Sequence, residues 1–165
     1  MTKVSSIEVA SNMLIGVISD THGLLRPELL LALANVDHIL HAGDIGNADI
    51  LTTLRGIAPV TAIRGNIDTH GPCADLLATE AIELSGCLIY IVHNLDDLDL
   101  NPQAAGIGVV LYGHSHKPSI DHRKGVLYLN PGSVGPRRFS LPITYALLRI
   151  ANTYPQAEIL SLDAS

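Results

Sequence analysis

The chain alternates short apolar runs with polar turns. Residues 13–19 (MLIGVIS) form a continuous apolar run, which is typical of a strand buried on both faces of a sheet. Residues 27–36 (PELLLALANV) place a proline near the first turn of an apolar stripe, which predicts a helix. Residues 38–41 and 60–64 predict two further strands, and residues 48–54 a second helix between them. This β-α-β-α-β order favours a parallel sheet with right-handed crossovers.

The second half of the chain predicts more strand than helix. Residues 81–84 and 88–92 flank Ser85-Gly86, which indicates a hairpin. Further strands are predicted at residues 109–112, 126–129, 144–150 and 157–162. We therefore expect an α/β fold in which two packed sheets are flanked by helices.

The composition is that of a compact protein. The 165 residues are 47% hydrophobic and 16% charged, which is typical of a single domain over residues 1–165. No apolar run reaches the roughly 20 residues that a membrane-spanning helix needs. Residues 1–13 lack the apolar block of a secretory signal and are interpreted as a disordered or peripheral extension. We expect a cytoplasmic protein with no membrane contact. Cys73 and Cys87 are then reduced thiols, with one disulfide between them as the alternative.

The net charge limits the kinds of binding partner that the sequence predicts. The formal net charge is −6, so the protein gains nothing from counterion release on a long polyphosphate. Extended nucleic acid is therefore not an expected partner, whereas small substrates and bound cations fit. Both a monomer and a homo-oligomer are compatible with the sequence.

Metal-ligand residue types follow the ends of five predicted strands. In open α/β sheets, ligands bind outside the carboxyl ends of the strands, so these side chains are expected to converge. In extended chain, residues i and i+2 point the same way, which pairs Asp20 with His22 and His114 with His116. Carboxylate, amide and imidazole ligands without thiolates suit Mn²⁺, Fe or Zn²⁺. The candidate ligands are Asp20, His22, Asp44, Asn66, His93, His114 and His116.

Each of these motifs alone has an ordinary structural explanation. Asp-x-His and Gly-Asp are most often turn chemistry. The pair His114 and His116 is harder to explain in this way, because imidazoles are costly to bury without a partner. Turn chemistry would not supply metal-ligand residue types at every strand end, so the joint pattern favours one common site.

The ordered motifs resemble a known family. The set DTHG (20–23), GD (43–44), GNID (65–68), His93 and GHSH (113–116) resembles the calcineurin-like metallophosphoesterases, and is most similar to their small bacterial and archaeal phosphodiesterase branch. NPGS at residues 130–133 also fits that branch. The resemblance implies a four-layer α/β/β/α sandwich with mixed sheets and two metals at one edge. One metal would be held by Asp20, His22 and His116, the other by Asn66, His93 and His114, with Asp44 bridging the two.

The resemblance implies a metal-dependent phosphoric ester hydrolase, with a phosphodiesterase of small or cyclic diesters favoured. Two divalent cations, Mn²⁺ first with Fe, Ni²⁺ or Zn²⁺ as alternatives, would share a hydroxide that attacks phosphorus. Asp44 and Asn66 would take part in catalysis, and Asp68 would orient a ligand or a nearby donor. Asn66, Arg64 and Arg137 are candidate substrate contacts, with solvated arginines as the alternative.

Three positions bear on the substrate and on the support of the site. Many relatives carry a histidine where this chain has Ile67, which cannot donate a proton. The change favours diesters or esters with good leaving groups. Asn94 and Leu95 stand where relatives usually have glycine and histidine after His93. His41, just before the Gly-Asp turn, is expected to support the site through a hydrogen bond.

Two alternative functions stay open beside the diesterase. One is a phosphomonoesterase or nucleotide phosphatase. The other is a protein-binding scaffold on the same fold, as in the retromer subunit that resembles this family. Such scaffolds tend to lose ligand residues, whereas all seven candidate positions here are chemically competent, which favours catalysis.

Overall fold

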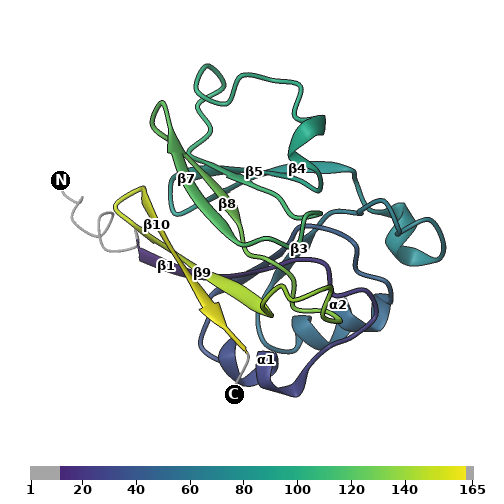
Figure 1. Ribbon diagram of the computed structural model, residues 1–165. Helices are drawn as coiled ribbons and strands as arrows, with labels where there is room; N and C mark the ends of the chain where they lie inside the picture. Colours follow the sequence, from purple (N-terminus) through teal and green to yellow (C-terminus); the bar gives the residue numbers. More distant parts are fainter. Residues whose placement is uncertain (1–11, 163–165) are drawn as a thin grey trace.

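The computed structural model describes residues 12–162 (Figure 1). The predicted extension 1–13 thus lies outside the described residues, except for Asn12 and Met13, which begin the first strand. The elements in chain order are β1 (Asn12–Ile18), α1 (Pro27–Ala32), β2 (His38–His41), α2 (Ala48–Arg55), β3 (Val60–Ala62), η2 (Pro72–Asp75), β4 (Thr79–Leu84), β5 (Cys87–Val92), η3 (Leu95–Asp97), β6 (Val109–Leu111), β7 (Ser119–Arg123), β8 (Val126–Asn130), β9 (Thr144–Ala151) and β10 (Tyr154–Ser161).

The strands form two mixed sheets of five strands each. The first sheet has the order β10-β9-β1-β2-β3, and the second has the order β4-β5-β6-β8-β7. In the first sheet β1, β2 and β3 are parallel, which confirms the predicted β-α-β-α-β unit. In the second sheet β5, β6 and β8 are parallel, with β4 and β7 as antiparallel edges.

The facing sides of the two sheets enclose a shared apolar core. Ile15 and Leu148 of the first sheet and Ile89 and Leu111 of the second are completely buried in it. Burying one such side chain stabilises the fold by about 1.5–3 kcal/mol. This core fixes the two sheets relative to each other, and with them the strand ends of both.

The outer faces of the sheets are covered differently. Helices α1 and α2 pack on the first sheet and bury Leu29 and Leu54 (Figure 1). On the second sheet, the segment between β5 and β6 packs Leu98 against Val110 and Tyr128. The sandwich is therefore confirmed, and its fourth layer is this segment with the short η3. In the described part of the chain, no helix is long and apolar enough to cross a membrane.

Helix α1 is shorter than the apolar stripe that predicted it. The helix ends at Ala32, and the next residues form tighter turns in which Val36 donates its backbone N–H to Leu33. Leu33 is completely buried against Gly16 of β1. The apolar stripe over residues 27–36 is thus longer than the helix, because residues after Ala32 also pack on the sheet.

Two-residue turns join three antiparallel strand pairs. Ser85-Gly86 makes the predicted hairpin of β4 and β5, with φ angles of 52° and 80°. Lys124-Gly125 and Asn152-Thr153 also have two positive φ angles, as type I′ hairpin turns require. Strand β7 was not predicted, because its mostly exposed residues form no apolar run.

Candidate metal centre

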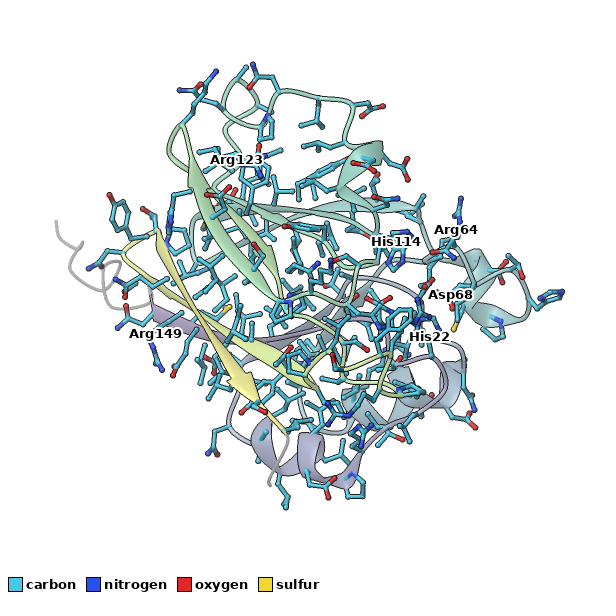
Figure 2. The ribbon with its side chains drawn as sticks, viewed as in Figure 1. His22, Arg64, Asp68, His114, Arg123 and Arg149 are labelled. Carbon is cyan, nitrogen blue, oxygen red and sulfur yellow. The ribbon has the colours of Figure 1, made fainter. Side chains whose placement is uncertain are left out.

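The candidate residues gather at one end of the sandwich. Figure 2 shows His22, Asp68, His114 and Arg64 close together there, away from Arg123. Strands β1, β2 and β3 of the first sheet and β5 and β6 of the second all lead into this end. The shared core therefore brings together side chains from two sheets.

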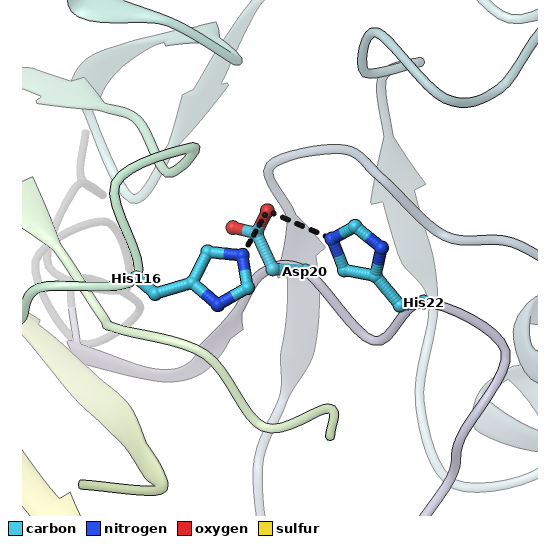
Figure 3. Close-up of side chains that lie close together, drawn as sticks. All are labelled: Asp20, His22 and His116. Carbon is cyan, nitrogen blue, oxygen red and sulfur yellow. Dashed lines mark ion pairs between the residues drawn. The ribbon is translucent and has the colours of Figure 1, made fainter. Parts of the chain in front are cut away.

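Asp20 lies at the centre of the site. His22 and His116 approach the same carboxylate oxygen from two sides, with Nε2 to Oδ1 distances of 3.5 Å and 3.4 Å (Figure 3). Asp20 is completely buried, and one ligand atom of each residue lies within 4.8 Å of the others. Asp20, His22 and His116 are called the first metal group below.

Asp44 and His93 complete a second group around the same carboxylate. His93 Nε2 lies 3.2 Å from Asp44 Oδ2 and 3.8 Å from Asp20 Oδ1. Its ring is oriented by Nδ1, which donates to the Ala42 carbonyl at 2.7 Å. Asp44 Oδ2 also lies 3.4 Å from His22 Nε2, so this carboxylate contacts a histidine of each group. Asp20, Asp44 and His93 are called the second metal group.

Asn66 and His114 lie beside the second metal group. Asn66 Oδ1 is 3.2 Å from His114 Nδ1, and both residues are exposed. The rings of His114 and His93 meet edge to face with centroids 5.2 Å apart. All seven predicted ligands are thus neighbours at one end of the fold.

The polar atoms of the site fit a bound cation. Among the described residues, Asp20 Oδ1, His22 Nε2 and His93 Nε2 are buried without a hydrogen-bond partner, and so is Nδ1 of His116. Each unpaired buried polar atom costs about 1–3 kcal/mol. Oxygen and imidazole nitrogen are ligands for divalent transition metals, so the residues present fit such an ion.

The backbone of the candidate ligand residues is unusual. Five of the seven have left-handed φ angles for non-glycine residues: Asp20 (60°), His22 (47°), Asp44 (58°), His114 (71°) and His116 (65°). Such a conformation costs about 1–3 kcal/mol per residue and clusters at functional sites. The extended geometry expected for Asp20 with His22, and for His114 with His116, is therefore wrong, because β1 already ends at Ile18 and β6 at Leu111. The side chains of Asp20 and His22 still meet, at 3.5 Å, with left-handed backbone at both residues.

Backbone hydrogen bonds hold this conformation. Three of them, at 2.8–2.9 Å, join residues 20–23 to residues 43–45. Gly65 packs so closely that a Cβ atom there would overlap Asp44. The ligand-bearing loops after β1, β2 and β3 are thus fixed to one another.

His41 supports the same loops, as the sequence predicted. Its Nδ1 accepts from the Gly43 amide at 3.1 Å, so Nε2 carries the proton and donates to Thr21 Oγ1 at 3.0 Å. Thr21 Oγ1 donates in turn to the Ile45 carbonyl at 2.8 Å. Complete burial lowers the pKa of His41 to about 4, which keeps the ring neutral near pH 7.

Asp68 binds backbone rather than ligand side chains. Its buried carboxylate accepts from the amides of Ile45, Gly46 and Gly65 at 2.8–3.1 Å. These amides belong to the loops after β2 and β3, which carry Asp44 and the exposed Asn66. Any effect of Asp68 on the reaction would therefore pass through these loops.

Ser19 fixes the orientation of the central carboxylate. Its hydroxyl donates to Asp20 Oδ2 at 2.6 Å, and the His114 amide donates to the same oxygen at 3.1 Å. Oδ1 is thereby left facing the histidines. This role was not predicted from the sequence, although the hydroxyl residue directly before Asp20 is a signal for it.

The carboxylates and the histidines of the site have pKa values that are shifted in opposite directions. Burial favours a higher pKa for Asp20, but contacts with His116 and His22 hold that pKa well below its usual range. Burial likewise opposes ionisation of Asp44, and His22 and His93 outweigh it in lowering its pKa. The close approach of His22 to the carboxylates of Asp20 and Asp44 raises its pKa to about 9, and the pKa of His93 is raised against the effect of burial.

Metal binding is predicted to release protons. His22 has a pKa of about 9 without a metal, and an imidazole must be neutral to bind one. The apparent affinity for Mn²⁺ should therefore rise with pH up to about 9 and then level off. Calorimetry at pH 7 in buffers of different ionisation heat should count at least about one released proton. A binding heat independent of the buffer would contradict this prediction.

The same pKa shift affects the metal-free protein. The pKa of His22 is raised from its ordinary value of 6.5 to about 9. The contacts of the protonated His22 with Asp20 and Asp44 therefore stabilise the fold fully below pH 6.5, and this stabilisation is lost as the pH rises through about 9. The lowered pKa values of Asp20 and Asp44 act oppositely, and their contribution is lost only in acid.

A cavity of about 220 Å³ opens beside the second metal group. Arg64 is among its lining residues, with Nη1 bound to the Leu76 carbonyl. Arg137 does not line this cavity; its Nη1 donates to Leu141 at 2.8 Å within its own exposed loop. Further lining residues are Asn66, Ala78, Thr79, Val92, His93, Asn94, Asp97 and His114.

The sequence matches a known family of phosphoesterases. Residues 13–153 match the calcineurin-like phosphoesterase superfamily domain. The chain belongs to this family. A probable metallophosphoesterase of Methanothermobacter thermautotrophicus is 37% identical over 92% of the chain and 94% of its own length. One of Methanocaldococcus jannaschii is 38% identical over 76% of the chain and 70% of its own length.

Solved structures of similar proteins share the fold. A predicted phosphoesterase of Streptococcus pneumoniae has a TM-score of 0.71 and 27% identity, covering 91% of this chain and 90% of its own. Vps29 of Entamoeba histolytica, solved in complex with zinc, has a TM-score of 0.75 and 22% identity over 93% and 95%. Family membership and the names of the relatives support a phosphoric ester hydrolase.

Proposed function

We propose that the chain, as one domain, is a phosphodiesterase that uses two divalent cations, Mn²⁺ first, to hydrolyse small or cyclic phosphodiesters. The observation that carries this proposal is the pair of metal groups that share Asp20, with Asp44 in contact with a histidine of each. When bound, two such cations polarise a phosphoryl oxygen and lower the pKa of a shared water.

The residues of the chain have distinct parts in this proposal. Asp20, His22 and His116 would hold one cation, and Asn66, His93 and His114 the other, with Asp44 between them. Asn66 is exposed and lines the cavity, so its amide can donate to a phosphate oxygen. Arg64 is the proposed cation for the substrate charge, because it lines the same cavity. Arg137 is a weaker candidate, since it is bound to its own loop.

Two observations favour a diester over a monoester. The cavity of about 220 Å³ beside the second metal group leaves room for a second ester substituent. Ile67 is 40% exposed at the site and offers no proton to a leaving group. In agreement, a protein of Escherichia coli named as a phosphodiesterase is 28% identical over 79% of the chain and 84% of its own length.

Two further observations bear on the scaffold alternative and on the cellular compartment. Retention of all seven candidate ligand residues, four of them with unpaired buried atoms, supports catalysis over a scaffold role. Cys73 and Cys87 are buried free thiols, which fits a reducing compartment, and we propose the cytoplasm.

Paired model substrates test the proposed reaction. The purified protein with Mn²⁺ is assayed on p-nitrophenyl phosphate and bis(p-nitrophenyl) phosphate. We expect kcat/KM for the diester to exceed that for the monoester by about tenfold or more, or about 1.4 kcal/mol. A preference for the monoester by the same factor would assign the protein as a phosphomonoesterase instead.

The cavity can be tested separately by filling it. Ala78 is exposed and lines the cavity, so Ala78→Phe should exclude the second arm of the diester. We expect KM for the diester to rise about tenfold, with Mn²⁺ affinity and monoester turnover unchanged. Ala104→Phe, at an exposed loop position away from the cavity, is the matched control. Equal effects of the two variants would show that the cavity does not bind substrate.

A further inference from the structure

The turn that follows β8 binds the segment that carries two of the histidines. Asn130 ends β8 and is 1% exposed. Its Nδ2 donates to the Gly113 carbonyl at 3.2 Å and to Ser115 Oγ at 3.1 Å, and its Oδ1 accepts from the Gly132 amide at 2.9 Å. Gly113 and Ser115 alternate with the histidines of GHSH. One buried amide therefore holds this segment at two points.

The same turn also binds the backbone of the central aspartate. Ser133 is 4% exposed, and its Oγ donates to the Asp20 carbonyl at 3.0 Å while accepting from the Gly135 amide at 3.1 Å. The Val134 amide donates to the carbonyl of Ser19 at 3.3 Å. Asp20 has a left-handed φ of 60°. The bond from Ser133 fixes the peptide plane that follows this unusual residue.

Close packing leaves the turn little freedom. A Cβ atom on Gly135 would overlap the backbone of Asp20 and Thr21. Gly132 has a φ of 78°, and a Cβ atom there would overlap Thr144 Oγ1. The turn is thus seated directly on the loop after β1, and a change in its hydrogen bonds reaches the ligand-bearing backbone.

We propose that Asn130 and Ser133 are positioning residues for the first metal group. One holds the segment of His116 and the other holds Asp20, so a single turn sets the relative place of two ligands that come from different sheets. Their hydrogen bonds reach the backbone and Ser115, not the ligand side chains. This inference rests on the proposed function only in requiring a divalent cation at the site.

Metal affinity tests the inference without an activity assay. Mn²⁺ binding to the full chain is measured by competition with a fluorescent chelator, for the wild type, Ser133→Ala and Asn130→Ala. Thr144→Val is the matched control, because Thr144 Oγ1 donates to the Pro131 carbonyl at 2.7 Å, within the same turn. Its loss removes a buried hydrogen bond of the same turn. Unfolding of each metal-free variant is followed in parallel.

We expect Ser133→Ala and Asn130→Ala to weaken Mn²⁺ binding about 10- to 100-fold, as removal of partners around a metal site typically does. Thr144→Val should change it by less than about threefold. Wild-type affinity in Ser133→Ala, or an equal loss in Thr144→Val, overturns the inference. Ser133→Ala removes a single oxygen and decides the question if Asn130→Ala does not fold. A wild-type protein that binds no Mn²⁺ instead contradicts the proposed function, before any variant is compared.

Discussion

Replacing Asp44 by asparagine is expected to abolish phosphoesterase activity while leaving the protein folded. Asp44 Oδ2 lies 3.2 Å from His93 Nε2 and 3.4 Å from His22 Nε2, so one carboxylate serves both metal groups. In the wild type, the Ile67 amide donates to Asp44 Oδ1 at 3.0 Å. Asparagine has the size of aspartate and keeps one side-chain oxygen that can accept this hydrogen bond. It lacks the negative charge that the two proposed cations would require. We expect kcat to fall by about 10³-fold or more, equivalent to roughly 4 kcal/mol of transition-state stabilisation.

Steady-state assays with saturating Mn²⁺ and thermal unfolding of the same preparation measure this effect. Asp49→Asn is the control, because Asp49 is an exposed carboxylate in the first turn of α2. It should retain wild-type turnover. An Asp44→Asn protein with near-normal kcat would remove the basis for assigning Asp44 to both metals.

The second large effect is expected for Asp68→Asn and concerns stability. Asp68 is 4% exposed, and its carboxylate accepts from three backbone amides. An asparagine would turn an NH₂ group toward some of these donors and leave buried groups unpaired. Hydrogen bonds to a charged group contribute about 1.5–3 kcal/mol each, so we expect the free energy of unfolding to fall by roughly 3 kcal/mol.

Denaturant unfolding of the metal-free protein measures this loss. Asp121→Asn is the control, since Asp121 pairs with Arg123 at the surface at 2.7 Å. Exposed pairs contribute little, so the control should stay within about 0.5 kcal/mol of the wild type. If the two variants were equally stable, the carboxylate of Asp68 would not be what joins the loops after β2 and β3.

Much of the fold follows from local patterns in the sequence. Buried strands such as β1 and β6 appear as unbroken apolar runs, because both faces of each sheet are covered. The hairpin at Ser85-Gly86 follows from a glycine at a position that requires positive φ. The exposed edge strand β7 and the true end of α1 have no such local signal, since solvent exposure and packing on the sheet decide them.

In the candidate site, too, some features have a local signal in the sequence and others have none. The convergence of its candidate ligand residues was predictable because each follows a strand, and strand ends of both sheets meet at one end of the sandwich. The left-handed backbone of Asp20 was not predictable, since it is held by hydrogen bonds to the distant residues Gly43 and Ser133. Asn130 and Ser133 illustrate the reason, because their partners Gly113 and Asp20 lie 17 and 113 residues away in the chain.

The most direct test of the central claim is a crystal structure of the protein loaded with Mn²⁺, with anomalous scattering measured to locate the ions. We predict two anomalous peaks about 3.5–4 Å apart at the end of the sandwich. One peak should lie among Asp20, His22 and His116, and the other beside His93, with Asp44 between them. A single peak, or none at these residues, would contradict the two-metal site.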